Sequence, residues 1–171
     1  TSAQHVQKLF RFTDTIVFSF DGDSAGRKAA WRAMTNALPY TSDTRTIKFL
    51  FLPPEHDPDS FVREFGADKF NAQISTAMTL SEFLLYGLKQ AAPEANAEAR
   101  ARQLNLAKPL LQAMPNNALR TQIIQAIAEQ LRIASTDVID YAELGTNQRP
   151  AKPGIEKSKR SQPLSAVEQA V

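Results

Sequence analysis

The 171-residue chain has an ordinary globular composition, with 43% hydrophobic and 22% charged residues, and it is long enough to bury the core of one or two small domains. It has no cysteine, which excludes a disulfide framework and a thiolate zinc site and is compatible with a reducing cytoplasm. No apolar run approaches the roughly 20 residues that span a bilayer, so no membrane partner is expected, and the net charge of +2 comes from residues 145–163, which carry +4.

Residues 1–78 are predicted to alternate helix and strand, as in an α/β layer. The expected order is a helix at 4–12, a strand at 15–20, a helix at 24–38, a strand at 46–52, a helix at 60–65 that Gly66 closes, and one more helix before residue 78. The first strand is apolar almost throughout, which is typical of a parallel strand covered on both faces. Helical spacing turns Val6, Leu9 and Phe10, and later Trp31, Met34 and Leu38, toward the core, and Ser24 is the predicted cap of the second helix.

Residues 79–144 are predicted to form an all-helical subdomain. Thr79 and Glu82 have the spacing of a capping box, which marks the start of its first helix. Apolar stripes then recur at helical spacing, with interruptions near Pro93 and at residues 115–117, and Ser135 is the predicted cap of the last helix. Because the connections are short, we expect antiparallel helices whose stripes form a core rather than a partner surface.

The sequence Asp21-Gly-Asp23 directly follows the first predicted strand. Ligands bind at the carboxyl ends of strands in such sheets, and Gly22 allows a sharp turn, so both aspartates can converge on one cation. The helix that begins here also offers free N–H groups to a phosphate held by the metal. The same pair occurs in calcium loops, phosphotransferases and plain helix caps, and by itself it does not decide among them.

A second acidic pair, Asp57 and Asp59, follows the second predicted strand. Parallel strands joined by a helix end at the same edge of a sheet, so the two pairs are predicted to share one edge. The structural alternative makes Asp59 a plain N-cap and Asp57 a turn former. Arg27 lies in the first turn after the first pair and is a candidate anion contact, whereas a solvated face explains Lys28 and Arg32 equally well.

These residues resemble a known family. Residues 21–30, the Phe51-Leu-Pro sequence and Asp57-Pro-Asp59 with Phe61 and Gly66 are similar to the second half of the Toprim catalytic domain of bacterial DNA primases, and the similarity extends to about residue 144. Type IA topoisomerases share only the Asp-x-Asp of this pattern. The resemblance implies an α/β fold with a partial Toprim-type parallel sheet and flanking helices, followed by an all-α helical subdomain.

The resemblance also implies an activity, namely a metal-dependent RNA polymerase that makes short primers on single-stranded DNA during replication by nucleotidyl transfer. Asp21, Asp23, Asp57 and Asp59 match the family's acidic motifs and are the expected catalytic residues. Asp21, Asp23 and Asp59 are the expected metal ligands, and Arg27 is the expected phosphate contact. The expected ion is Mg²⁺, for which Mn²⁺ can substitute, and zinc is expected only in a module of the parent protein.

The family's further metal-binding glutamate has no match and would precede Thr1, so we expect an excised, inactive piece of a longer protein. The expected parts are the C-terminal part of the Toprim domain at 1–78, the helical subdomain at 79–144, a flexible basic linker at 145–163, and the start of a helicase-binding C-terminal domain at 164–171. The expected partners are single-stranded DNA template, nucleoside triphosphates, RNA primer and, through the parent's C-terminal domain, the replicative helicase. A cytoplasmic monomer is expected.

Two other functional classes stay open on the residues alone. An aspartyl phosphotransferase or phosphatase-like enzyme would use Asp21 as nucleophile and Asp23 as general acid, but that class usually has Thr or Val where this chain has Ala25. A non-catalytic helical adaptor would bind a partner through residues 79–171 and use the α/β half as support. The two acidic pairs argue against the adaptor.

Overall fold

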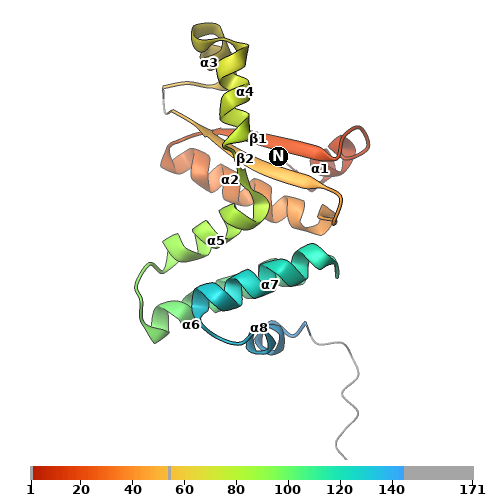
Figure 1. The fold of residues 1–171 in the computed structure, drawn as a ribbon, viewed down its shortest axis with the longest axis vertical. Helices are drawn as coiled ribbons and strands as arrows, with labels where there is room; N and C mark the ends of the chain where they lie inside the picture. Colours follow the sequence, from red (N-terminus) through yellow and green to blue (C-terminus); the bar gives the residue numbers. More distant parts are fainter. Residues whose placement is uncertain (1, 54, 145–171) are drawn as a thin grey trace, which may run out of the picture.

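The computed structural model describes residues 2–53 and 55–144, and it shows a mixed α/β part followed by a helical part (Figure 1). The described elements are α1 (Ala3–Leu9), β1 (Thr15–Asp21), α2 (Ser24–Ala37), the 3-10 helix η1 (Leu38–Tyr40), β2 (Thr46–Leu52), α3 (Pro58–Phe65), α4 (Ala67–Ser75), β3 (Met78–Thr79), α5 (Leu80–Ala91), α6 (Ala97–Ala113), α7 (Ala118–Leu131) and α8 (Ser135–Tyr141). The predicted α/β fold class is confirmed. The predicted linker at 145–163 and the segment 164–171 lie outside the described residues.

The sheet has the order β1-β2-β3, with β2 in the centre. β1 and β2 are parallel and in register from Thr15 opposite Thr46 to Asp21 opposite Leu52. β3 pairs its two residues antiparallel to the middle of β2. The sequence did not predict β3, because two residues cannot show the alternation by which a strand is recognised.

Side chains cover the sheet on both faces, as the apolar first strand predicts. Ile16 and Phe18 of β1, and Ile47 and Phe49 of β2, face the larger core together with α2 and α5. The ring of Phe49 stacks on Phe83 of α5 with 4.7 Å between centroids, and this contact joins the helical part to the sheet. The opposite face packs against α3 and α4, which rise on the side of the sheet away from α2 in Figure 1.

The capping box at the start of α5 is present as predicted. The backbone N–H of Thr79 donates to Glu82 Oε2 at 2.7 Å, and the backbone N–H of Glu82 donates to Thr79 Oγ1 at 3.4 Å. The Thr79 N–H and hydroxyl hold the pKa of the Glu82 carboxyl below its ordinary value, because both hydrogen bonds favour the charged form.

The apolar stripes of the helical part are buried, so their assignment to the core is confirmed; Leu111, Ile127 and Leu131 are each exposed by 1% or less. Two local predictions are wrong. Leu9 is 44% exposed because α1 ends there and the chain turns away. Ser135 is the first residue of α8 and not its cap, and Ala134 occupies the cap position. Among the described residues, none of the helices has the length and apolar character required to cross a membrane.

Candidate active site at the edge of the sheet

The parallel pairing brings the ends of both strands to one edge of the sheet. Asp21 is the last residue of β1 and lies opposite Leu52, the last residue of β2. Each strand is then followed by a helix whose N-cap is an aspartate, Asp23 for α2 and Asp57 for α3. Both acidic pairs therefore follow the carboxyl ends of parallel strands, and Asp21, Asp23, Asp57 and Asp59 are all exposed.

Asp23 caps α2, so the prediction that Ser24 caps it is wrong. The Gly26 backbone N–H donates to Asp23 Oδ1 at 2.6 Å, and Ser24 is the first residue inside the helix. Aspartate and serine are equally good N-caps, so the sequence could not decide between neighbouring candidates. The cap occupies Oδ1 and leaves Oδ2 of the exposed Asp23 side chain available to a ligand at the sheet edge.

Gly26 allows the first turn of α2 to approach the end of β1. A Cβ atom at this position would lie 2.1 Å from the carbonyl oxygen of Asp21, a distance that real Cβ atoms do not reach. Because the obstructing atom belongs to the backbone, the helix or the strand would have to move. This role was not predicted, and the one sequence signal for it is a glycine in the first turn of a helix that follows a strand.

Asp57 is the N-cap of α3 and forms a capping box with Ser60. The Ser60 backbone N–H donates to Asp57 Oδ1 at 2.7 Å, and the Asp57 backbone N–H donates to Ser60 Oγ at 3.0 Å. The Ser60 backbone N–H, followed by the Ser60 hydroxyl, lowers the pKa of the Asp57 carboxyl below its ordinary value of 3.8. The alternative that makes Asp59 the N-cap and Asp57 a turn former is wrong in its assignment of the cap.

Asp59 lies in the first turn of α3 and pairs with Arg63 one turn later. Both side chains are more than three quarters exposed, at 77% and 79%. An exposed i, i+4 pair stabilises a helix by only about 0.3–0.5 kcal/mol. The fold therefore depends on Asp57 more than on Asp59.

The four acids do not form one cluster. Within residues 2–53 and 55–144, no group of three or more His, Cys, Asp or Glu side chains is placed to hold one metal ion. The donors at the end of β1 nevertheless suit a hard cation, because Mg²⁺ prefers oxygen ligands and is often held by one or two carboxylates while it keeps several waters. Asp21 and the free oxygen of Asp23 are the exposed carboxylate donors at the end of β1.

Arg27 points its guanidinium group at aromatic rings beside this edge. Its Cζ atom lies 4.8 Å from the ring centroid of Phe51, in β2, and 5.6 Å from that of Tyr86, in α5. These contacts hold the cation next to the strand ends without neutralising it. The predicted phosphate contact stays a prediction, and the ring contacts were not predicted because they join residues far apart in sequence.

Comparison with known proteins gives consistent likenesses. Residues 81–136 match the family model of the DnaB-helicase binding domain of primase. The DNA primase of Pasteurella multocida is 41% identical over 144 residues, which cover 84% of this chain and 24% of that protein. A DNA primase domain of Pseudomonas aeruginosa is 42% identical with a TM-score of 0.78, over 84% of this chain and 45% of that one. The DnaG primase catalytic domain bound to ssDNA is 40% identical with a TM-score of 0.76, over 80% and 44%.

The chain thus spans about a quarter of the length of the curated relative, 24%, and less than half of the solved domains, 45% and 44%. The matched residues of the helicase-binding family model lie in α5–α8, within the described helical part. The resemblance inferred from the motifs is confirmed, and the chain is homologous to a segment of the catalytic core of bacterial DNA primases.

Proposed function

We propose that this chain is a segment of a DNA primase, a cytoplasmic enzyme that synthesises short RNA primers on single-stranded DNA during replication. The observation that carries the proposal is the placement of Asp21 and Asp23 at the carboxyl end of β1, where a parallel neighbour ends as well. The identity to DNA primases over most of the chain supports it. We assign the α/β part to the second half of a Toprim domain on the same grounds.

The reaction is nucleotidyl transfer, in which a 3′-hydroxyl attacks the α-phosphate of a nucleoside triphosphate and pyrophosphate leaves. Asp21 and Oδ2 of Asp23 would hold a Mg²⁺ ion, and Mn²⁺ can take its place. Bound there, such an ion would supply a lower pKa for the attacking hydroxyl and would stabilise the charge on the attacking and leaving oxygens. The carboxylates would orient the ion and balance its charge, and they form no covalent bond with the substrate.

Asp57, Asp59 and Arg27 complete the proposed site. Asp57 and Asp59 follow the end of the neighbouring strand, β2. Their negative charge would attract a second ion or change the affinity of the first. Arg27, held by the Phe51 and Tyr86 rings, offers a guanidinium group to a phosphate at the edge. Only Asp21 and Asp23 lie at the carboxyl end of β1, and no group of three or more acidic, histidine or cysteine side chains that could hold a metal ion is found among the described residues. We therefore expect weak metal binding and no activity in this chain alone.

We also propose that the parent protein contacts the replicative helicase through the helical part. The family model matched at residues 81–136 supports this location. The sequence-based assignment of a helicase-binding domain that starts at 164–171 lies outside the described residues and stays a prediction. An aspartyl phosphotransferase is less well supported, because Ala25 occupies the position that usually carries Thr or Val in that class.

The test of the catalytic assignment uses the full-length parent protein and measures primer synthesis together with the melting temperature. Asp21→Asn and Asp23→Asn should each nearly abolish primer synthesis and leave the melting temperature unchanged, because Asn keeps the size of the side chain and still caps α2 at position 23. Asp14→Asn is the matched control, since it removes the same charge just before the opposite end of β1. Full activity of Asp21→Asn would refute the assignment.

A further inference from the structure

A groove of about 500 Å³ lies between α2 and α5. We call it the α2–α5 groove. The lining residues that matter here are Arg27, Lys28, Trp31 and Arg32 from α2, and Phe83 and Tyr86 from α5. Of these six, the three exposed ones are all basic, Trp31 and Tyr86 are half-buried, and Phe83 is buried. The groove therefore combines an aromatic floor with a rim of basic side chains.

The aromatic floor is formed by side chains that pack against one another. The rings of Trp31 and Phe83 pack edge to face with 6.1 Å between centroids. The indole lies against Gly87 of α5 so closely that a Cβ there would approach Trp31 Cζ3 to 2.0 Å. Gly87 thus makes the space in which the Trp31 ring sits, and the ring is held as one wall of the groove.

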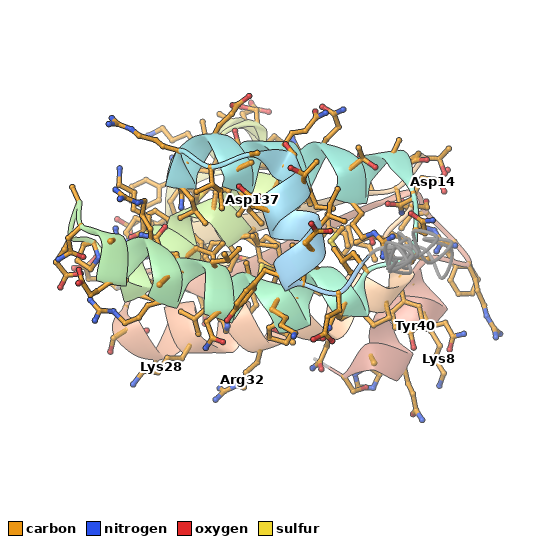
Figure 2. The ribbon with its side chains drawn as sticks, turned by 90° about the horizontal axis from the view of Figure 1, so that it is seen from below. Lys8, Asp14, Lys28, Arg32, Tyr40 and Asp137 are labelled. Atoms are coloured by element: carbon orange, nitrogen blue, oxygen red, sulfur yellow. The ribbon has the colours of Figure 1, made fainter. Side chains whose placement is uncertain are left out.

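Among the described residues, no acidic side chain neutralises the cations on the rim. None of the ion pairs among the described residues involves Arg27, Lys28 or Arg32. The described residues that line the groove include no Asp or Glu. Lys28 and Arg32 are one helical turn apart, and Figure 2 shows both projecting from the same side of α2, away from the ribbon. This charge suits an anionic ligand, and the aromatic floor suits a ligand with a flat apolar face.

The groove is continuous with the edge of the sheet that carries the acids. Arg27 lines the groove, and its backbone N–H donates to the carbonyl oxygen of Asp23 at 3.0 Å. Its guanidinium group lies over Phe51, one residue before the end of β2. An extended ligand that leaves the acidic edge along α2 would therefore enter the groove directly.

We propose that the α2–α5 groove binds single-stranded DNA, with a base against Trp31 and Tyr86 and backbone phosphates at Lys28 and Arg32. Proteins that bind single strands without sequence preference combine a positive groove with stacking aromatic rings in this way. The inference rests on the proposed function, for which single-stranded DNA is the template, and it assigns to this chain a template contact outside the acidic edge. Double-stranded DNA fits the site poorly, since its bases are already stacked on each other.

The chain contains one tryptophan, Trp31, so its fluorescence reports directly on the groove. Titration of the whole chain with a thymidine oligomer should quench this fluorescence. An otherwise identical oligomer with abasic sites should bind more weakly and quench less. The double variant Lys28→Ala/Arg32→Ala should lower the affinity and reduce the slope of log K against log salt by about 1.4, because each lost phosphate contact on a single strand removes about 0.7.

Lys8→Ala/Arg11→Ala is the matched control, since it also removes one lysine and one arginine from exposed positions. Lys8 lies at the opposite end of the molecule from Lys28 in Figure 2. This control should leave the affinity and the salt slope unchanged. Tyr86→Leu keeps apolar bulk but removes a stacking ring, and it should weaken binding about 5-fold or more.

Three results would overturn the proposal: no quenching of Trp31 by the oligomer, an equal loss of affinity in both double variants, or equal binding of polyglutamate, which would indicate an acidic protein partner. Asp21→Asn should leave binding of the oligomer intact, so that the groove and the catalytic edge are tested separately. If Asp21→Asn keeps full primer synthesis while the groove variants lose DNA affinity, the catalytic assignment fails and the groove assignment stands.

Discussion

The two halves of the molecule use their polar side chains differently. In the helical half, the buried Gln103 donates to the carbonyl oxygen of Ala92 at 2.6 Å and accepts from Gln130 at 2.9 Å, which ties α5, α6 and α7 together. At the edge of the sheet, Asp21 and Asp23 are exposed, and of their carboxylate oxygens only Asp23 Oδ1 serves a cap. The buried amide of Gln103 is therefore satisfied inside the fold, whereas three of the four carboxylate oxygens of Asp21 and Asp23 serve no cap.

The loop between η1 and β2 also joins the two halves through hydrogen bonds. The backbone N–H groups of Leu119 and Ala118, at the start of α7, donate to the Asp43 carboxylate at 2.9 and 3.3 Å. The side-chain amide of Asn117 donates to the carbonyl oxygen of Thr41 at 3.2 Å. The acid just before β2 is thus used to position a helix of the other half, and it serves as a structural counterpart to the acids after the strands.

The largest expected effect is at Gly26, where the two roles meet. Gly26→Ala places a methyl group on the carbonyl oxygen of Asp21, so the first turn of α2 must shift, and we expect a loss of about 1–3 kcal/mol in the free energy of unfolding. Urea denaturation measures it. Ala25→Gly, at the neighbouring position, should cost less than about 1 kcal/mol. An unchanged stability of Gly26→Ala would mean that the close approach is not required.

Asp43 should behave as a structural residue. Asp43→Ala leaves two N–H groups at the start of α7 without their acceptor. We expect the free energy of unfolding to fall by about 1 kcal/mol, which thermal denaturation measures. Asp43→Asn keeps one carbonyl oxygen in place and should recover part of that loss. If both variants are as stable as the unmodified chain, the loop does not hold the helical half.

Variants of the second acidic pair distinguish the effect of an N-cap on stability from the effect of a surface charge. Asp57→Ala should lower the free energy of unfolding by about 1 kcal/mol. Asp57→Asn should lower it much less, because asparagine still accepts from the Ser60 backbone N–H. Asp59→Ala loses only the exposed pair with Arg63, a few tenths of a kcal/mol. Chemical denaturation of the three variants measures the order. A larger loss for Asp59→Ala than for Asp57→Ala would contradict the assignment of the cap.

The smallest effect is the titration of Asp57. Its pKa is lowered in the folded chain, so its stabilising contribution is complete above the ordinary value of 3.8 and is lost as the pH falls through the folded pKa. Carboxyl NMR should give a midpoint below 3.8. Ser60→Ala removes the hydroxyl and leaves the stronger backbone hydrogen bond, so the midpoint should rise and stay below 3.8. A midpoint unaffected by Ser60→Ala would exclude the hydroxyl as a cause.

The sequence predicted the features that depend on local pattern. The two parallel strands, the apolar stripes and the capping box at Thr79 were predictable, because each has a characteristic spacing. The caps of α2 and α3 were each misplaced, since two adjacent or nearby residues could fill the position and the backbone alone decides. The role of Gly26 depends on an approach between elements in three dimensions, which no local pattern contains. The α2–α5 groove is unpredictable for the same reason.

The central claim is that the negative charges of Asp21 and Asp23 serve a metal ion and are not needed for the fold. Its most direct test is Mn²⁺ titration of the isotope-labelled chain followed by NMR. Mn²⁺ binds oxygen donors like Mg²⁺ and broadens the signals of nearby nuclei. We expect the amide signals of Gly22 and Asp23 to broaden first. Asp21→Asn/Asp23→Asn should abolish that broadening with the melting temperature unchanged. Broadening that persists in the double variant, or a variant that unfolds, would contradict the account.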